Sequence, residues 1–173
     1  MYRHVLVTGA PGTGKTTVIQ RLARLVGDLQ LAGFCTAEIR RRGERRGFRL
    51  IGFDGTEALI AHVDLPKTAR VGKYGVDVAA MDAAADAALA PSQGVQLYLV
   101  DEIGKMECLS VRFVEHMQRI VAGRVPLIAT VARRGSGYIA EVKRDQRCEL
   151  WTLSRANRDA MPEELLAWLR SRR

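Results

Sequence analysis

The stretch Gly9-Ala10-Pro11-Gly12-Thr13-Gly14-Lys15-Thr16 matches the phosphate-binding pattern G-x-x-x-x-G-K-S/T at every position. An apolar strand is expected before it, at residues 4–8, and a helix with one apolar face after it, at residues 15–26. Glycines let several backbone N–H groups point at one phosphate, and the helix N-terminus adds a positive dipole. We therefore expect this segment to bind a nucleotide, with Lys15 at the β- and γ-phosphates and Thr17 near the α-phosphate.

Two adjacent carboxylates, Asp101 and Glu102, follow the apolar run Leu97-Tyr98-Leu99-Val100. This run predicts a buried strand at residues 95–100, and the carboxyl ends of parallel strands form the active edge of a sheet. Asp101 and the Thr16 hydroxyl are oxygen ligands of the kind that Mg²⁺ takes beside phosphates. Glu102 can face the γ-phosphate and accept a proton from an attacking water. A carboxylate in this position favours hydrolysis over transfer to an acceptor, although an acidic surface pair is the alternative.

The rest of the chain alternates strands with helices, which predicts an α/β fold with a mainly parallel sheet flanked by helices. Expected strands lie at 31–39, 126–131 and 149–153, and expected helices at 78–89, 110–121, 138–143 and 162–170. Strands at 47–53 and 57–63 flank Asp54-Gly55, a hairpin signal that predicts an antiparallel insertion. An arginine-rich turn is expected at 40–46 and an ordered loop at 67–78. Residues 1–173 are expected to form a single P-loop domain.

Composition limits the classes of protein that this chain can belong to. The 173 residues carry a formal net charge of +8, which favours polyanionic ligands. The arginine excess is concentrated at 40–46 and 170–173 without interleaved aromatic residues, so it supports a nucleic-acid partner only weakly. The three cysteines, Cys35, Cys108 and Cys148, are widely spaced, which indicates reduced thiols. With no apolar run of about 18 residues and no signal peptide, a cytoplasmic protein without a membrane partner is expected.

Several longer motifs carry a family resemblance. They are Gly33-Phe34 with Thr36 and Glu38-Ile39-Arg40, then Val71-Gly72-Lys73-Tyr74, then Asp101-Glu102-Ile103-Gly104-Lys105-Met106-Glu107, then Asn157-Arg158. Together they resemble the THEP-type nucleoside-triphosphatase family, which includes the cancer-related nucleoside triphosphatase. The resemblance implies a P-loop fold of the RecA/AAA-like kind, and hydrolysis of ATP, GTP and other nucleoside triphosphates to diphosphate and phosphate. It also implies that residues 9–16 and 101–107 line the nucleotide site.

The remaining candidate residues have two interpretations each. Lys105 can neutralise charge on the transferred phosphoryl group, or it can form an ion pair with Glu107. Asn157 and Arg158 follow the last strand, where Arg158 can stack on a base. Arg40 can act in catalysis or pair with Glu38.

Two other functions remain open on the same scaffold. One is a nucleotide or small-molecule kinase, and the other is a nucleic-acid-associated ATPase switch. Two features argue against the kinase. They are the position of Glu102 and the lack of a second phosphate-binding lid with paired arginines. A GTPase switch is disfavoured because the chain has no Asn-Lys-x-Asp string.

Overall fold

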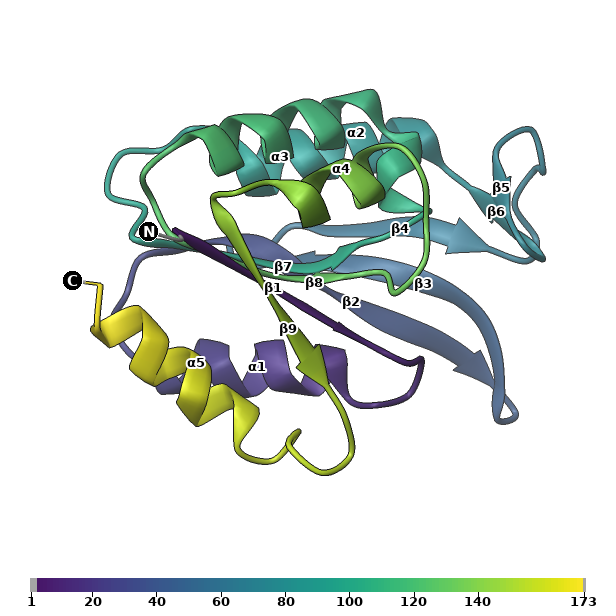
Figure 1. The fold of residues 1–173 in the computed structure, drawn as a ribbon. Helices are drawn as coiled ribbons and strands as arrows, with labels where there is room; N and C mark the ends of the chain where they lie inside the picture. Colours follow the sequence, from purple (N-terminus) through teal and green to yellow (C-terminus); the bar gives the residue numbers. More distant parts are fainter. Residues whose placement is uncertain (1–2, 173) are drawn as a thin grey trace.

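The computed structural model describes residues 3–172, in which nine strands form one sheet. The strand order is β5-β6-β4-β3-β2-β7-β8-β1-β9 (Figure 1). The strands are β1 (His4–Gly9), β2 (Leu31–Arg41), β3 (Glu44–Gly52), β4 (Glu57–His62), β5 (Arg70–Val71), β6 (Tyr74–Val76), β7 (Leu97–Ile103), β8 (Leu127–Val131) and β9 (Cys148–Leu153). The helices are α1 (Lys15–Leu25), α2 (Val78–Leu89), α3 (Val111–Ala122), α4 (Tyr138–Arg144) and α5 (Met161–Arg170), with a short 3-10 helix at Glu107–Leu109.

Strands β2, β7, β8, β1 and β9 form a parallel core. Their sequences are runs of Val, Leu and Ile because helices cover both faces. The expected mainly parallel sheet flanked by helices is thus confirmed. Strand β8 lies between β1, which leads into the phosphate loop, and β7, which carries the acidic pair. A residue on β8 can therefore reach both parts of the candidate site.

The other half of the sheet is antiparallel and larger than the sequence predicts. Strand β2 runs on past the parallel core to pair with β3, β3 pairs with β4, and β4 leads to the short β5–β6 hairpin. The expected turn at residues 40–46 is wrong, because only Arg42 and Gly43 turn. Their φ angles of 50° and 80° are typical of a tight two-residue hairpin. The loop expected at 67–78 likewise contains β5 and β6.

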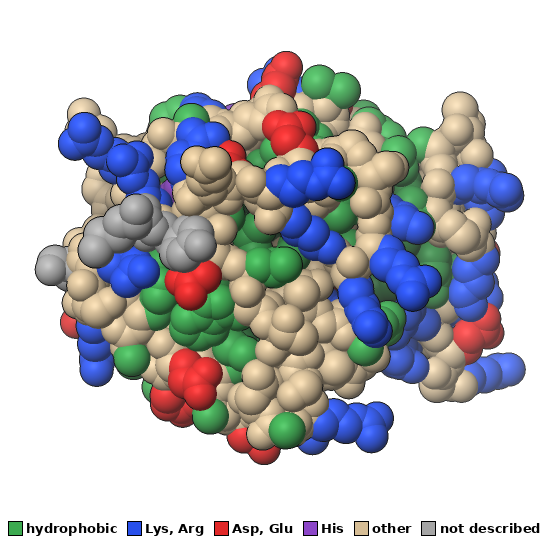
Figure 2. All heavy atoms as spheres, in the orientation of Figure 1, with side chains coloured by type: hydrophobic (Ala, Val, Ile, Leu, Met, Phe, Trp, Pro, Cys, Tyr) green, Lys and Arg blue, Asp and Glu red, His purple; other side chains and the backbone are tan. Residues whose placement is uncertain are grey.

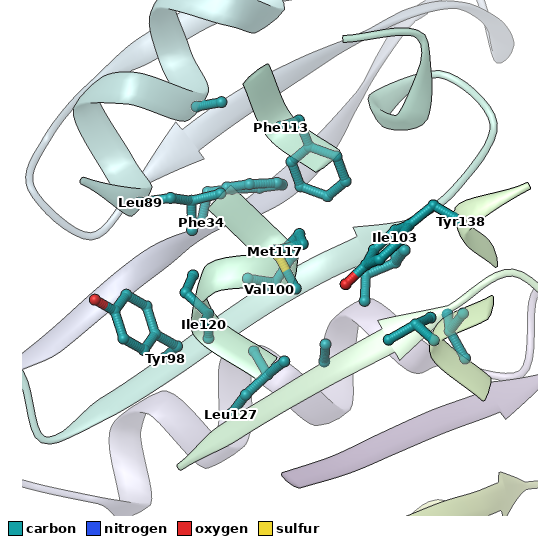
Figure 3. Close-up of a cluster of buried hydrophobic side chains, with 14 of the residues drawn as sticks. Phe34, Leu89, Tyr98, Val100, Ile103, Phe113, Met117, Ile120, Leu127 and Tyr138 are labelled. Atoms are coloured by element: carbon teal, nitrogen blue, oxygen red, sulfur yellow. The ribbon is translucent and has the colours of Figure 1, made fainter. Parts of the chain in front are cut away.

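Two helical layers enclose the sheet (Figure 1). Helices α2, α3 and α4 lie on one face, and α1 and α5 on the other. Each layer has its own apolar cluster. On the α2–α3 side, the rings of Phe34 and Phe113 pack in a tilted arrangement with centroids 6.0 Å apart, amid buried side chains such as Met117 and Val100 (Figure 3). Burial of these surfaces at about 25 cal/mol per Å² is the main driving force for the fold.

Side-chain caps mark the beginnings of α2 and α3. The Asp77 carboxylate accepts a hydrogen bond from the Ala80 N–H at 2.9 Å, and the expected cap Ser110 accepts one from the Phe113 N–H at 3.0 Å. Strand β7 ends later than predicted, because Asp101, Glu102 and Ile103 continue it with an irregular register against β8. Within residues 3–172, none of the helices combines the length and the apolar character that crossing a membrane requires.

Candidate active site

The phosphate loop is closed by its own side chains. Strand β1 ends at Gly9 and helix α1 begins at Lys15. The Thr13 hydroxyl donates to the Ala10 carbonyl at 2.8 Å, and the Lys15 ammonium donates to the Gly9 carbonyl at 3.0 Å. The ammonium therefore lies across the loop at the N-terminus of α1, where anion binding is favoured.

The Asp101 carboxylate is buried and accepts hydrogen bonds from three hydroxyl groups. On Oδ2 it receives Thr16 Oγ1 at 2.6 Å and Thr36 Oγ1 at 3.2 Å, and on Oδ1 it receives Thr130 Oγ1 at 2.6 Å. The donors come from α1, β2 and β8. We call these four residues the hydroxyl cluster. It ties the phosphate loop to the acidic strand at the expected edge of the sheet.

Two further carboxylates lie beside the cluster. Glu102 Oε1 and Glu107 Oε2 would lie 2.7 and 2.8 Å from a Cβ atom added at Gly104, so the glycine provides the space for both. Burial and the nearby Asp101 charge raise the pKa of Glu102, although Lys15 and Lys143 oppose this. Burial, reinforced by Glu102, raises the pKa of Glu107 to about 8. A carboxylate with a raised pKa is a stronger proton acceptor than one in water.

A cleft of about 660 Å³ joins these parts. Its lining includes the phosphate loop, the acidic pair and side chains from the antiparallel half. The lining residues are Pro11, Gly12, Gly14, Lys15, Thr16, Gln20, Thr36, Ala37, Glu38, Arg45, Phe48, Val71, Asp101, Glu102, Lys105, Met106, Glu107, Ala132 and Arg134. A separate pocket of about 260 Å³ adjoins the loop, lined by Gly14, Thr17, Val18, Arg21, Arg158 and Asp159. Gly14 lines both, so the phosphate loop borders two pockets.

The structure separates some of the residues that the sequence groups together. Ile103 is fully buried in the apolar core and does not line the cleft. Lys105 lines the cleft, and among the described residues it has no ion pair with Glu107. Arg40 pairs with Glu38 at 2.7 Å and lies outside the cleft, in accordance with the structural interpretation.

The two residues expected near the base have different surroundings. Arg158 lines the smaller pocket beside Gly14 and Thr17. The Asn157 side chain instead holds the turn after β9. Its Oδ1 accepts from the Ser154 N–H at 2.8 Å, and its Nδ2 donates to the Thr152 carbonyl at 2.9 Å. Asn157 therefore supports the loop that carries Arg158.

Sequence reasoning missed three residues near the acidic pair. Thr130 is a polar residue inside the apolar strand β8, and that contrast is a signal that could have identified it. Arg134 lines the cleft from the loop after β8. Lys143, on α4, has its charge close enough to Glu102 to lower the pKa of that carboxyl group. Neither cation belongs to a motif, so no local pattern points to it.

The oxygen atoms of Thr16 and Asp101 suit a hard divalent cation. A hydroxyl and a carboxylate 2.6 Å apart are the ligand types that Mg²⁺ accepts, together with phosphate oxygens. Within residues 3–172, no group of three or more His, Cys, Asp and Glu side chains could hold a metal. The Thr16 and Asp101 oxygens fit an ion that takes its other ligands from a bound phosphate.

Comparison with known proteins places the chain in a family. A model of the NTPase family matches residues 4–166. The nucleoside-triphosphatase THEP1 of Thermotoga sp. (strain RQ2) is 36% identical over 170 residues, which cover 98% of this chain and 97% of that protein. The cancer-related nucleoside-triphosphatase homolog of Bos taurus is 28% identical over 189 residues, covering all of both chains.

Two solved structures have the same fold over nearly the whole chain. The crystal structure of THEP1 from Aquifex aeolicus has a TM-score of 0.87 and 30% identity, covering 96% of this chain and 98% of that one. The solution structure of a human cancer-related nucleoside triphosphatase has a TM-score of 0.84 and 27% identity, covering 99% of each. This chain therefore belongs to the NTPase family, together with the THEP1 nucleoside-triphosphatases.

Proposed function

We propose that this protein hydrolyses nucleoside triphosphates, including ATP and GTP, to nucleoside diphosphate and phosphate with the help of Mg²⁺. The observation that carries the proposal is one cleft that contains the phosphate loop, the hydroxyl cluster and Glu102. Family membership supports the same activity, because the matched relatives are named as nucleoside-triphosphatases.

The phosphate end of the substrate is bound by this chain's own groups. The N–H groups of residues 10–16 and the N-terminus of α1 attract phosphate oxygens. Lys15 gives up its bond to the Gly9 carbonyl, 3.0 Å away, for the β- and γ-phosphates. Thr16 and Asp101 would hold Mg²⁺, which would neutralise charge on the phosphates. Thr36 and Thr130 keep the Asp101 carboxylate in place.

Glu102 holds and orients the attacking water. Its carboxylate lines the cleft and is partly buried, so a water bound there is shielded from bulk solvent. The water oxygen attacks the γ-phosphorus while its proton passes to Glu102 and the diphosphate leaves. The transition state for phosphoryl transfer is loose, so the position of the water matters at least as much as the proton transfer.

Base choice is broad in this proposal. Two arginines line the smaller pocket, and Arg21 is paired with Glu163 at 3.2 Å, so Arg158 is the one proposed to stack on a base. Asn157 next to it is occupied with backbone groups. Stacking accepts every base because each has a π face. A site that reads a base edge by hydrogen bonds can reject the wrong base by about 10⁴-fold. We expect much smaller ratios between ATP, GTP, CTP and UTP.

The test is phosphate release from a panel of triphosphates with Mg²⁺ or with EDTA. The parent protein should release phosphate from several triphosphates and lose the activity in EDTA. Lys15→Ala should remain folded and lose at least about 10²-fold in turnover. Arg24→Ala is a matched control, because it removes an exposed cation from the same helix outside the cleft. Full activity of Lys15→Ala, or full activity in EDTA, would refute the proposal.

A further inference from the structure

The loop that follows β8 is attached to the acidic strand and to α4. Its first N–H, from Ala132, donates to the Ile103 carbonyl at 3.1 Å, one residue beyond Glu102. The Lys143 ammonium on α4 donates to the Arg133 carbonyl at 2.9 Å. The two residues that precede Arg134 are therefore held by the acidic strand β7 and by α4. The backbone position from which the Arg134 side chain extends is thus fixed near Glu102, the candidate residue for binding the water.

Arg134 is the residue of this loop whose long side chain lines the cleft, together with Lys15 and Glu102. Among the described residues it has no hydrogen bond and no ion pair. Arg45, the other guanidinium in the lining, is already paired with Glu38 and lies over the Phe48 ring. A guanidinium without a carboxylate partner has all of its N–H groups available to donate hydrogen bonds to an incoming phosphate.

Besides Arg134, the cations that line the cleft are Lys15, Lys105 and Arg45, and Arg45 is already paired with Glu38. The lining holds four carboxylates, Glu38, Asp101, Glu102 and Glu107, and one of them accepts three hydroxyl hydrogen bonds. Lys15 is at the phosphate loop, which follows β1, and β8 lies between β1 and the acidic strand β7. The negative charge that spreads over the γ-phosphoryl oxygens needs donors on the side facing Glu102. Arg134 follows β8 and lines the cleft together with Glu102.

We propose that Arg134 is a catalytic residue that acts within its own chain by donating hydrogen bonds to the transferred γ-phosphoryl group. This inference rests on the proposed hydrolytic function. In the step, a bond forms between the water oxygen and the γ-phosphorus, and the bond to the β–γ bridging oxygen breaks. The water proton goes to Glu102 and the bond electrons stay with the diphosphate. Arg134 exchanges no proton and forms no covalent bond; it stabilises the charge on the phosphoryl oxygens.

Lys143 is assigned a positioning role in the same proposal. Its ammonium holds the Arg133 carbonyl and does not line the cleft. Loss of this contact should loosen the loop without removing the Arg134 guanidinium. Lys143→Met should therefore lower turnover by less than Arg134→Ala does, with little change in KM.

The experiment compares Arg134→Ala with Arg133→Ala, the neighbouring exposed arginine whose side chain does not line the cleft. Single-turnover phosphate release from Mg-ATP should fall by about 10²–10³-fold in Arg134→Ala. It should stay near the parent rate in Arg133→Ala. Affinity for Mg-ATP and for Mg-ADP should change by less than about tenfold in both. Arg134→Lys should recover only part of the rate, because an ammonium lacks the bidentate fork.

A binding measurement gives a second readout that does not depend on turnover. Mg-ADP with aluminium fluoride mimics the planar transferred group, and it should bind the parent and Arg133→Ala tightly. Arg134→Ala should bind Mg-ADP normally and lose the extra affinity that fluoride confers. Parent-like hydrolysis by Arg134→Ala, with fluoride binding intact, would overturn the assignment and leave the proposed function standing. A parent protein that releases no phosphate would overturn both.

A mixing experiment tests whether the arginine acts within one chain. Arg134→Ala retains the phosphate loop, and Lys15→Ala retains Arg134. If Arg134 serves its own cleft, a mixture of the two variants should show only the sum of their separate activities. Recovery of activity in the mixture, rising with protein concentration, would show that the residue is supplied by a second copy and would contradict the proposal.

Discussion

Several polar groups of the parallel half of the sheet are buried, whereas the charged groups of the antiparallel half lie at the surface. In the parallel half, His4, Asp101 and Thr130 are almost completely buried, and each has specific hydrogen-bond partners. In the antiparallel half, the charged groups form ion pairs at the surface, such as Arg46 with Asp64 and Arg49 with Glu57. Figure 2 shows Lys and Arg side chains gathered over the side of the molecule where β5 and β6 lie in Figure 1.

The difference shows that burial decides how much a polar or charged contact contributes to the free energy of unfolding. Exposed pairs contribute about 0–1 kcal/mol because water screens them. A buried polar group that loses its partner costs about 1–3 kcal/mol or more. The antiparallel half therefore has many charged contacts of small effect, whereas the parallel half has few polar contacts of large effect. The proposed metal ligand Asp101 belongs to the second kind.

The largest effect on stability should come from His4. Its Nδ1 accepts from the Leu127 N–H at 3.1 Å and its Nε2 lies 3.1 Å from the Val121 carbonyl, so the neutral ring fits the site. Burial lowers the pKa of His4 to about 4 from 6.5. As the pH falls, His4 therefore binds a proton at a higher pH in the unfolded chain than in the folded protein. The stabilisation that the neutral His4 provides should be fully present above about pH 6.5. The free energy of unfolding should fall by roughly 3 kcal/mol as the pH is lowered from 6.5 to 4.

Urea unfolding at several pH values measures this effect. His4→Asn, which retains an acceptor for the Leu127 N–H, should be less stable at pH 7.5 and should lack this part of the pH dependence. The matched control is His62→Asn in the antiparallel half, which should follow the parent curve closely. Equal slopes for the parent and His4→Asn between pH 6.5 and 4 would contradict the assignment of a buried neutral histidine.

A pair of isosteric substitutions sharpens the comparison inside the parallel half. The Thr130 hydroxyl donates to Asp101 at 2.6 Å, so Thr130→Val should cost about 1.5–3 kcal/mol, the range for a hydrogen bond to a charged group. The buried Thr8 hydroxyl has no partner among the described residues, so Thr8→Val should be neutral or slightly stabilising. Chemical denaturation of both variants measures the difference. Equal costs would show that the partner does not set the energetic weight.

The smallest effect is expected at the Arg49–Glu57 pair between β3 and β4. Its atoms lie 3.5 Å apart and both side chains are about half exposed. A double-mutant cycle with Arg49→Gln and Glu57→Gln should give a coupling of about 0.2–1 kcal/mol that decreases with added salt. A coupling larger than the cost of Thr130→Val would reverse the ranking of the two halves.

The sequence is most informative where local patterns and chemistry coincide. The phosphate loop is preceded by an apolar strand and followed by an amphipathic helix, so the β1–α1 unit could be predicted from the sequence. The acidic pair could be predicted because it follows a wholly apolar run. The alternation of strands with helices then gave the parallel sheet without any tertiary information.

The antiparallel half was harder to predict because its strands are exposed and rich in arginine. Residues 40–46 have neither the apolar run of a buried strand nor an Asn-Gly or Asp-Gly pair at the turn, and Arg42-Gly43 takes that place. Thr130, Arg134 and Lys143 were missed for a different reason. Their roles depend on β8 lying between β1 and β7, and that strand order is a property of the folded sheet.

The most direct test of the hydrolytic account is single-turnover phosphate release by Glu102→Gln, measured together with Mg-ATP affinity. The amide keeps the shape of the side chain and leaves Thr16 and Asp101 in place. Affinity should therefore stay within about tenfold of the parent, while the rate should fall by about 10²–10⁴-fold, the range for a general base. The nucleotide recovered with the variant should be triphosphate. A parent-like rate with parent-like affinity would contradict the account, because it would remove Glu102 from the activation of water.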